Sequence, residues 1–286
     1  MSDKTWLITG CSSGFGKELV KIVAEKGGKV IGTVRKKEQV QTLEAINPGL
    51  VKGIVLDVQD QKSIDEAAKV VESVYGRLDV LVNNAGYGTL GPVEEISNEE
   101  MLRQFDVNVF GAVRMMKFAL PFMRRQKSGR ILNITSIAGL QGYPGVGIYN
   151  GSKFALEGIG EALAAETRHL GIYVTNVEPG PFRTDWAGRS ATYNESSIGD
   201  YEGSAAKNMD SIKNVSGNQV GDPVKAAKAM FELAILENPP VHLPLGGPAY
   251  KRVRMKLEEF EKEVADFEYL GKPTDYTEEE LNALAK

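Results

Sequence analysis

The sequence predicts an α/β protein in which about seven parallel strands form one doubly wound sheet with helices on both faces. Short apolar runs of strand length alternate with longer stretches in which apolar residues recur every three or four positions. A glycine-rich turn, Gly10 to Gly16, joins the first apolar run to the first helical stretch. The 286 residues are 42% hydrophobic and 25% charged, which is ordinary for a globular protein of one or two domains.

Composition and charge exclude several classes of function. Lys plus Arg number 34 and Asp plus Glu 38, a net charge of −4 that offers no electrostatic footprint for nucleic acid or a membrane surface. No apolar run approaches the ~18 residues needed to span a bilayer, and the N-terminus does not resemble a signal peptide. Cys11 is the only cysteine, so no internal disulfide is possible. We therefore expect a cytoplasmic protein acting on a small molecule, without nucleic-acid partners or membrane spans.

The turn after the first strand, Trp6 to Ile8, is suited to a dinucleotide. Its glycines let the backbone approach a ligand closely, and the helix that follows presents unpaired N–H groups and a positive dipole end to a pyrophosphate. The spacing is G-x-x-x-G-x-G rather than the G-x-G-x-x-G of long-chain dehydrogenases. We expect cofactor contacts from Gly10, Ser12, Ser13, Gly14, Phe15 and Gly16.

The end of the second strand, Lys29 to Val34, indicates which dinucleotide binds. Many dinucleotide folds place an acid there to hold the adenosine ribose hydroxyl. In this chain Arg35, Lys36 and Lys37 follow the strand instead. An anion such as a 2′-phosphate suits these side chains better, so we predict NADP(H) rather than NAD(H), with Arg35 as the contact.

The alternation of strands and helices continues to about residue 247. Such alternation indicates a parallel sheet with right-handed crossovers, in which ligands bind beyond the carboxyl ends of the strands. Pro121 is expected to kink the longest helix near its end. Further strands are expected at 51–56, 78–82, 130–135, 172–177 and 241–245. Further helices are expected at 61–75, 98–126 and 225–237, and one more helix is expected to end at Leu170.

Tyr149 and Lys153 form a candidate acid-base pair. On a helix, their spacing of four residues puts both side chains on one face, one turn apart. A phenol ordinarily titrates near ~10, and a neighbouring positive charge lowers that pKa. Tyr149 would then give a proton to a carbonyl oxygen or take one from an alcohol. An isolated pair of this kind is common on amphipathic helices, so its weight depends on the other motifs.

Together with those motifs, the chain resembles the compact, single-domain branch of the short-chain dehydrogenase/reductase family, which has a Rossmann-type sheet. Within the family it looks most like steroid and retinol dehydrogenases and NADPH-dependent carbonyl reductases. The match covers residues 9 to 184 in the family's order and spacing. It is carried by the turn Thr9 to Gly16, Asp57, the run Asn83-Asn84-Ala85-Gly86, Asn108, Ser136, Tyr149 with Lys153, Pro179-Gly180 and Thr184.

The resemblance implies a role for each matching residue. Tyr149 is the implied acid, and Lys153 lowers its pKa and holds the nicotinamide ribose. Asn108 is implied to bend its helix around a bound water that continues a proton path from the lysine. A serine hydroxyl at a strand end, as at Ser136, polarises a substrate carbonyl. The implied cofactor contacts are Asp57 and Val58 at the adenine, Asn84, Ala85 and Gly86 at the adenosine ribose, Thr184 at the carboxamide, and also Tyr149, Lys153, Pro179 and Gly180.

The substrate region is predicted from loss of periodicity. Residues 181–221 are rich in Gly, Ser, Asn and Asp with isolated aromatics, as in a substrate-binding lid. An apolar pocket suggests a hydrophobic ketone or secondary alcohol. His169 and His242 lie in no metal-ligand spacing, so no metal is expected. The predicted pocket residues are Tyr87, Leu90, Leu140, Tyr143, Val146, Phe182 and Trp186.

The chain divides into one catalytic domain, 1–247, and a charged C-terminal extension, 248–286. The extension is expected to contain one amphipathic helix, with Val253, Leu257, Phe260 and Val264 on its apolar side, followed by a frayed acidic end. Because the extension exceeds the length of the family's shortest members, homodimer and homotetramer both stay open.

The sequence therefore predicts an NADP(H)-dependent oxidoreductase that transfers a hydride between the nicotinamide and a carbonyl or secondary alcohol of a hydrophobic substrate. A 3-oxoacyl-[acyl-carrier-protein] reductase is one alternative, for which a basic docking patch near the active site is required. A non-catalytic NADP(H)-binding sensor is another, and a sugar-nucleotide epimerase fits the glycine spacing less well. The basic residues available for a docking patch are Arg124, Arg125, Lys127 and Arg130.

Overall fold

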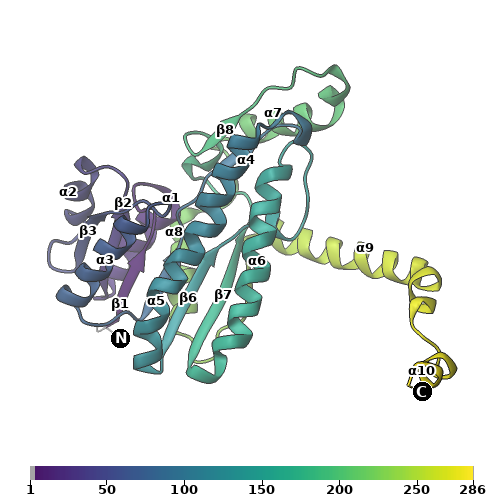
Figure 1. Cartoon of the computed structure of the whole chain (residues 1–286). Coiled ribbons are helices and arrows are strands. Elements are labelled where there is room, and N and C mark those ends of the chain that lie inside the picture. The colour runs from purple at the N-terminus through teal and green to yellow at the C-terminus, as the bar shows by residue number, and fades with distance from the viewer. Residues whose placement is uncertain (1–3, 286) are drawn as a thin grey trace.

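The computed structural model describes residues 4–285, and it confirms the predicted α/β architecture. All neighbouring strands of the main sheet pair in parallel, in the order β3-β2-β1-β4-β6-β7-β9 (Figure 1). Ser136 follows the carboxyl end of β6, a central strand in this order. The strands are β1 (Thr5–Ile8), β2 (Lys29–Val34), β3 (Val51–Val55), β4 (Val80–Asn83), β6 (Gly129–Ile134), β7 (Ile172–Pro179) and β9 (His242–Leu245).

Helices cover both faces of this sheet and create two separate cores. Alternate residues of β1 show the division, because Trp6 and Ile8 lie in one core and Leu7 in the other. Burial on both faces explains why the strands are nearly continuous apolar runs. One face carries α1 (Gly14–Glu25), α2 (Glu38–Glu44) and α8 (Pro223–Ile235), and the other carries α3 (Gln61–Val74), α5 (Ala112–Gln126) and α6 (Gly147–Thr167).

The long helix expected at 98–126 is interrupted. It divides into α4 (Asn98–Phe105), a π-helical segment (Asp106–Gly111) and α5, and α5 continues through Pro121 to its end. The interruption therefore lies at the π-helical segment, whereas the helix is continuous through Pro121, where a kink was expected. Asn108 lies in this segment, where its side chain accepts a hydrogen bond from the Tyr87 N–H (3.1 Å) and donates one to the Tyr87 carbonyl (2.9 Å).

The two ends of the segment 181–221 meet. Phe182 and Gly221 form an isolated parallel bridge, so the segment leaves and re-enters the body at one place. Between these points the chain is more regular than its composition indicates. It contains β8 (Ala191–Tyr193), which pairs with β5 (Gly88–Leu90), the helix α7 (Lys207–Asn214), short 3-10 turns at Asp185–Ala187 and Gly199–Tyr201, and a π turn at Glu202–Ala206.

A row of buried asparagines crosses the middle of the sheet. Asn83, Asn133 and Asn176 are register partners on β4, β6 and β7. Asn83 Nδ2 donates to Asn133 Oδ1 (2.9 Å), and Asn133 Nδ2 donates to Asn176 Oδ1 (3.1 Å). The row ends where Asn176 Nδ2 donates to the Glu157 carbonyl on α6 (2.9 Å). It thereby fastens α6, which carries Tyr149 and Lys153, to the sheet.

The C-terminal extension projects from the body as α9 (Gly247–Gly271) and then turns into a second helix, α10 (Glu278–Leu284) (Figure 1). The expectation of a frayed end was wrong for α10, because Thr277 and Glu280 form a reciprocal capping box at its start. Between residues 4 and 285 no helix combines the length and apolarity required to cross a membrane. Short 3-10 turns complete the chain at Val93–Glu95, Ile137–Gly139, Arg168–Leu170 and Lys272–Thr274.

Candidate active site

Tyr149 and Lys153 are buried side by side in the first turns of α6. The Lys153 Nζ lies 5.7 Å from the centroid of the Tyr149 ring. It donates a hydrogen bond to the Ile134 carbonyl at the carboxyl end of β6 (2.8 Å). This bond fixes the ammonium at the edge of the sheet where ligands of such folds bind.

Burial dominates the electrostatics of this pair. It raises the pKa of the Tyr149 phenol above its ordinary value, and a hydrogen bond with Ser136 acts in the opposite direction. It also lowers the pKa of Lys153 to about 8, although the nearby Glu157 carboxylate favours the charged ammonium. The sequence-based expectation that Lys153 lowers the Tyr149 pKa is thus opposed by the cost of desolvating a phenolate.

Asn108 and Ser136 reach the same place from two other elements. A Cβ at Gly86 would lie 3.1 Å from Asn108 Oδ1 and 3.8 Å from Lys153 Nζ, which shows how closely these groups surround the turn after β4. Ser136 follows β6, and its hydroxyl accepts a hydrogen bond from the Ala138 N–H (3.0 Å). The four catalytic candidates therefore converge from three elements.

Ser152 was not identified from the sequence. Its hydroxyl accepts a hydrogen bond from Asn108 Nδ2 (3.2 Å) and donates one to the Tyr149 carbonyl (2.7 Å). It therefore connects the π-helical segment to the helix that carries Tyr149 and Lys153. The available signal was its position between the tyrosine and the lysine on a buried helical face.

The glycine turn fits a dinucleotide pyrophosphate. Gly14 has a φ of +57°, and a Cβ at Gly16 would lie 2.5 Å from Asn84 Nδ2 and 2.6 Å from the Gly10 carbonyl oxygen. Asn84 Nδ2 itself donates to the Gly10 carbonyl (3.0 Å), so the turn after β4 braces the turn after β1. The N-cap residue Ser13 makes no side-chain capping bond, and no acidic residue lies in the first turn of α1. The first N–H groups of α1 thus suit an anion.

We expect Gly16→Ala to lower the free energy of unfolding by about 1–3 kcal/mol, because overpacking of this size forces the backbone or Asn84 to shift. Gly158→Ala is the matched control: a Cβ there meets nothing within 4 Å on α6, and alanine favours a helix interior. Thermal unfolding of Gly16→Ala and of Gly158→Ala measures the change in melting temperature of each variant. An equal shift in the melting temperature would contradict the close packing at Gly16.

The remaining cofactor candidates line the same edge. Asp57 Oδ1 accepts a hydrogen bond from the Gln59 N–H (3.0 Å), and the following Val58 is buried. Arg35 is exposed directly after the end of β2. Thr184 lies beside the glycine turn, since a Cβ at Gly14 would be 3.6 Å from the Thr184 Cβ. The other candidates also follow strands of the sheet: Ala85 and Gly86 after β4, with Pro179 ending β7 and Gly180 following it.

An apolar cluster surrounds Tyr149 and includes four predicted pocket residues, Leu90, Tyr143, Val146 and Trp186. The Trp186 ring centroid is 5.0 Å from that of Tyr149. The segment 181–221 therefore contributes directly to the surroundings of the phenol. Sequence reasoning missed other members of the cluster, which are Ala138, Ala191, Tyr193, Met209 and Ile212.

The other predicted pocket residues lie outside this cluster. Phe182 packs edge-on against Phe15 of the glycine turn, with ring centroids 5.2 Å apart. The Tyr87 hydroxyl donates to Glu100 Oε1 (3.2 Å), and burial with this carboxylate raises the pKa of Tyr87 to about 12. Leu140 is half-buried after the short 3-10 turn at Ile137–Gly139.

A second group of titratable side chains lies one turn beyond Lys153 along α6 and on the neighbouring strands. Glu157 on α6, Glu178 on β7 and His242 on β9 bring possible ligand atoms within 4.8 Å of one another. His242 Nδ1 is 2.7 Å from Glu178 Oε1 and 3.5 Å from Glu157 Oε2. Burial raises the pKa of each carboxyl to about 7. The sequence assigned no role to His242, since its partners lie far away in the chain.

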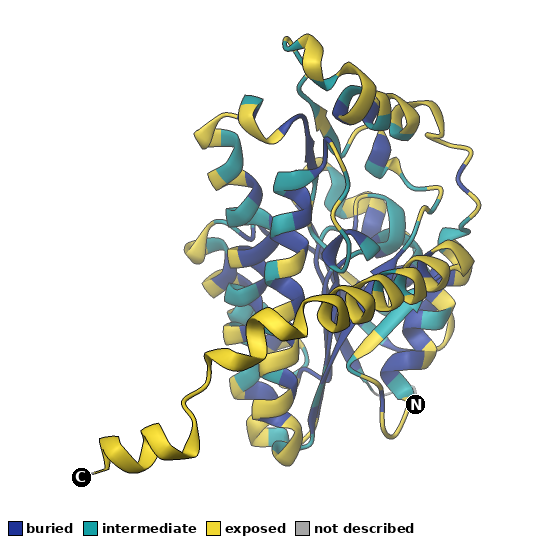
Figure 2. Ribbon diagram, turned by 90° about the vertical axis from the view of Figure 1, so that its right-hand side faces the viewer, coloured by how far each residue is buried: buried dark blue, intermediate teal, exposed yellow. Residues whose placement is uncertain are grey.

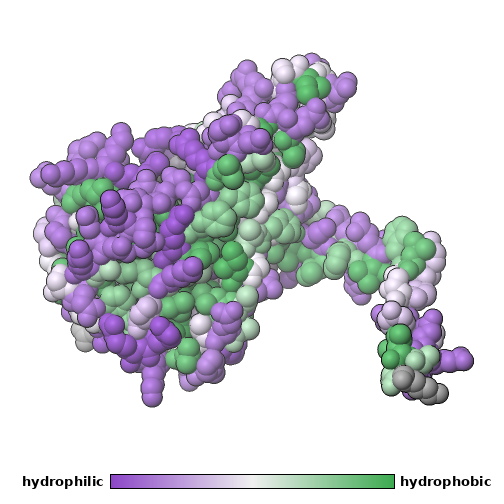
Figure 3. All heavy atoms as spheres, in the orientation of Figure 1, coloured by the Kyte–Doolittle hydropathy of each residue, from purple (hydrophilic) through white to green (hydrophobic). Residues whose placement is uncertain are grey.

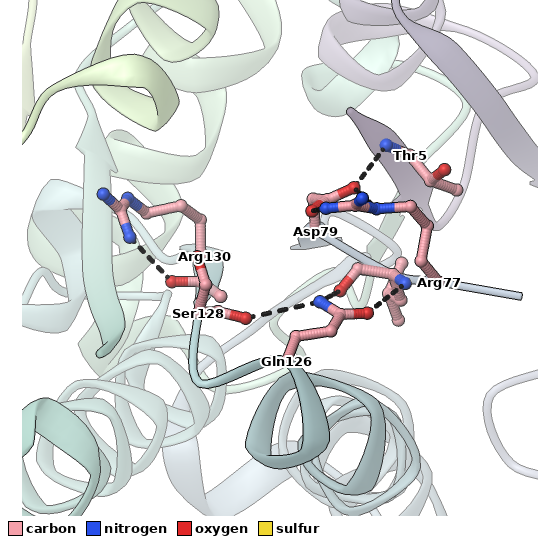
Figure 4. Close-up of polar contacts among 8 residues, drawn as sticks. Thr5, Arg77, Asp79, Gln126, Ser128 and Arg130 are labelled. Atoms are coloured by element: carbon pink, nitrogen blue, oxygen red, sulfur yellow. Dashed lines mark hydrogen bonds and ion pairs between the residues drawn. The ribbon is translucent and has the colours of Figure 1, made fainter. Parts of the chain in front are cut away.

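The basic residues considered for a carrier-protein patch lie at the opposite end of the sheet. Arg130 is the second residue of β6 and donates to the Leu236 carbonyl (3.0 Å), and Arg125 forms an ion pair with Glu72 (3.3 Å). Figure 4 shows Arg130 among the polar contacts at this amino end, with Gln126 and the Arg77–Asp79 ion pair. Arg124 and Lys127 are exposed nearby on the same helix end. This arrangement does not favour a docking patch at the active-site mouth.

Known proteins resemble this chain in both sequence and fold. The family model for short chain dehydrogenase matches residues 4–194. A 3-ketodihydrosphingosine reductase from Bacteroides thetaiotaomicron is 38% identical over 247 residues, covering 86% of this chain and 89% of the reductase. Retinol dehydrogenase 8 from Homo sapiens is 43% identical over 191 residues, 65% of this chain and 61% of that protein. A solved short-chain dehydrogenase from Streptomyces avermitilis has a TM-score of 0.89 at 38% identity, covering 95% and 98% of the two chains.

The chain therefore belongs to the short-chain dehydrogenase/reductase family, and it is an oxidoreductase of the NAD(P)-dependent kind. Solved structures of other similar proteins contain either NADP+ or NAD. The family is thus established. The preference of this chain between NADP(H) and NAD(H) depends on its own cofactor-binding residues.

Proposed function

We propose that this protein is an NADP(H)-dependent reductase of hydrophobic ketones, acting also on the corresponding secondary alcohols. The observation that carries the proposal is the position of the Tyr149 phenol, buried against Lys153 on one side and the apolar cluster of Leu90, Val146 and Trp186 on the other. An apolar surface beside an acid suits a substrate whose carbonyl is its main polar group. In this proposal residues 1–247 form the catalytic domain, and the protein acts in the cytoplasm.

The chain's own residues would divide the work of carbonyl reduction. The bound nicotinamide supplies the hydride, and the protein supplies position and electrostatics. Ser136 donates a hydrogen bond to the carbonyl oxygen, where negative charge develops. Tyr149 gives that oxygen its proton and becomes a phenolate, and the positive charge of Lys153 lowers the cost of this anion in the buried site. Asn108 holds the backbone of Tyr87 and so keeps this side of the site in place.

Arg35 supports the choice of NADP(H). It lies at the end of β2, where many NAD-binding folds have an acid, and the exposed Lys36 and Lys37 follow it. A guanidinium offers a planar donor pair that matches a phosphate better than an ammonium does. Arg35 is therefore the side chain proposed to contact the 2′-phosphate.

We expect Arg35→Ser to lower kcat/KM for NADPH by about 10- to 100-fold, because a hydrogen bond to a charged group is worth about 1.5–3 kcal/mol. The value for NADH should change little. Lys26→Ser is the matched control, since Lys26 is an exposed cation that caps the far end of α1. Steady-state kinetics with both cofactors measure the effect. An equal loss with NADPH and NADH would remove Arg35 from the phosphate site.

The substrate class is tested by following NADPH oxidation with apolar ketones of increasing chain length, a steroid, retinal and a 3-oxoacyl thioester. The names of the similar proteins, which refer to a ketosphingoid base and to retinol, favour long apolar molecules. We expect turnover of long-chain ketones to exceed that of the thioester. A protein that binds NADPH but oxidises it with none of these compounds would instead support the sensor function.

A further inference from the structure

We propose that α9 is a pairing arm through which two copies of this chain associate as an antiparallel coiled coil. The inference is independent of the substrate and cofactor proposed above. It is based on the exposure of the helix, the spacing of its apolar residues and the order of its charges.

The helix α9 leaves the body without covering its own apolar side. Ala249, at its base, is the only buried residue among the 25 residues of the helix. Figure 2 shows the helix as an exposed arm, and Figure 3 shows apolar residues along it. Leu257 is 63% exposed and Phe267 is 58% exposed. A single helix of this kind gains no hydrophobic stabilisation from packing, although packing supplies most helical stability in proteins.

The apolar residues follow the heptad pattern of a coiled coil. Six of them are spaced alternately three and four residues apart, which places these six on one seam of the helix, whereas Met255, Tyr269 and Leu270 lie off this seam. Starting from Tyr250 in position a, the pattern is maintained for the length of the helix and gives three a and three d positions. The seam residues are Tyr250, Val253, Leu257, Phe260, Val264 and Phe267.

The charged residues beside the central part of the apolar seam are not used in ion pairs within the arm. The ion pairs formed within the arm, Lys262–Asp266 (2.7 Å) and Glu268–Lys272 (2.8 Å), use residues of its polar side or its end. In the part of the chain that the structure describes, none of the four charged residues beside the central seam has an ion-pair partner: Arg254, Lys256, Glu261 and Glu263. These four positions flank the seam as e and g of the heptad, where pairing partners are selected.

The order of these charges selects an antiparallel second copy. With Leu257 opposite the partner's Phe260, antiparallel packing places Arg254 beside the partner's Glu261. In the same register Lys256 lies beside the partner's Glu263. The two-fold axis repeats both contacts, so all four flanking pairs are of opposite charge.

The parallel arrangement is less favourable. It would also bring Lys256 beside the partner's Glu261, but it would place Glu263 beside the partner's Glu268 on both sides. Like charges at these positions disfavour pairing and thereby select the partner orientation. The antiparallel pair has no such repulsion among the central contacts.

The charges also argue against a membrane surface as the occupant. Helices that lie on membranes carry Lys and Arg along the polar face. The second half of α9 is instead mainly acidic, with six carboxylates against one lysine between residues 258 and 268. Anionic lipid would repel this half. A second copy, with its basic half laid against this acidic half, is the complementary surface.

The first experiment exchanges the charges and then restores them. We expect Arg254→Glu/Lys256→Glu to halve the molar mass measured by light scattering at about 10 μM. Glu261→Arg/Glu263→Lys should do the same. An equimolar mixture of the two variants should regain the mass of the wild type, because each arm then meets opposite charges. Unchanged mass in both variants, or no recovery on mixing, would overturn the proposal.

The second experiment reports orientation. The only natural cysteine, Cys11, is 1% exposed, so engineered cysteines on the arm are the reactive ones. Lys256→Cys/Glu263→Cys should form a disulfide-linked dimer under mild oxidation, since these positions face each other in the antiparallel pair. Lys256→Cys/Glu261→Cys is the control, because its positions meet only in a parallel pair. Faster cross-linking of the control would overturn the proposed orientation.

Folding and alternative occupants are checked with the same variants. Circular dichroism and NADPH binding should stay at wild-type levels, because α9 packs on little of the body. Vesicles of phosphatidylcholine and phosphatidylserine are the membrane probe. Sedimentation of the wild type with these vesicles, lost in Leu257→Glu/Val264→Glu, would assign the seam to lipid and overturn the pairing.

Discussion

Tyr149→Phe is expected to reduce turnover by about 10² to 10⁴-fold, the range in which a positioned general acid contributes. The substitution removes only the hydroxyl, and the ring keeps its packing against Trp186. The loss should therefore appear in kcat, while the Kd for NADPH stays near the wild-type value. Stopped-flow measurement of a single turnover, together with a fluorescence titration of NADPH, separates the two quantities.

Tyr173→Phe is the matched control for this experiment. Tyr173 lies near the amino end of β7, away from the catalytic edge, and its hydroxyl makes a long hydrogen bond to Asn238 (3.4 Å). Its turnover should equal that of the wild type. If Tyr149→Phe also kept wild-type turnover, Tyr149 would not be the acid.

Glu157→Gln is expected to stabilise the protein above neutral pH. Burial raises the pKa of Glu157 from 4.5 to about 7, so the folded state binds this proton more tightly than the unfolded state does. Stability is then lost as the pH rises from about 4.5 through about 7. The increase in the pKa of Glu157 from 4.5 to about 7 corresponds to a loss of about 3 kcal/mol in the free energy of unfolding, since one pKa unit is worth about 1.4 kcal/mol. A neutral amide at this position does not incur that loss.

Urea unfolding at pH 5 and pH 8 measures the effect. The advantage of Glu157→Gln should be about 3 kcal/mol at pH 8 and should shrink toward zero near pH 4.5. Glu161→Gln is the control, because Glu161 is exposed one turn further along α6 and lies 3.6 Å from the outer nitrogen of His242. A variant that is less stable than the wild type at pH 8 would show that the Glu157 carboxylate stabilises the fold through His242.

Much of the fold follows from local sequence. The strand Lys29–Val34 has the predicted bounds, because a run of β-branched residues there is closed by a glycine pair before it and by charges after it. The convergence of Ser136 with Tyr149 and Lys153 also follows, since parallel strands bring their carboxyl ends to one edge. Repeated alternation of strand and helix was therefore enough to predict the fold class and the edge that carries the site.

Features that depend on distant contacts were predicted only in part: the family resemblance implied a bend of the helix at Asn108, but not the π-helical form of the segment or its partner Tyr87. The π-helical segment around Asn108 is stabilised by hydrogen bonds to Tyr87, a residue on another element. Phe182 packs on Phe15 because the two ends of the segment 181–221 meet beside the glycine turn, which no local pattern reveals. In contrast, the capping box at Thr277 and Glu280 has a sequence signature, and that signature was overlooked.

The direction of the Tyr149 pKa was missed for a similar reason. Spacing along the helix shows that a lysine is near, but it does not show how completely the phenol is removed from water. Desolvation raises the pKa of Tyr149 and is the larger effect in the structure, and the hydrogen bond with Ser136 acts in the opposite direction. Burial has to be known before the sign of such a shift is predicted.

The row of Asn83, Asn133 and Asn176 gives the sheet a means of rejecting misaligned strands. Because helices cover both faces of this sheet and both faces are apolar, a strand that slips along its neighbour still buries apolar groups. Apolar burial alone therefore distinguishes poorly between registers. Such a slip would leave buried amides without partners, at a cost of about 1–3 kcal/mol for each unpaired group. The hydrogen bonds among the three asparagines thus favour the native register of β4, β6 and β7, although the bonded residues lie 43 to 50 positions apart in the chain.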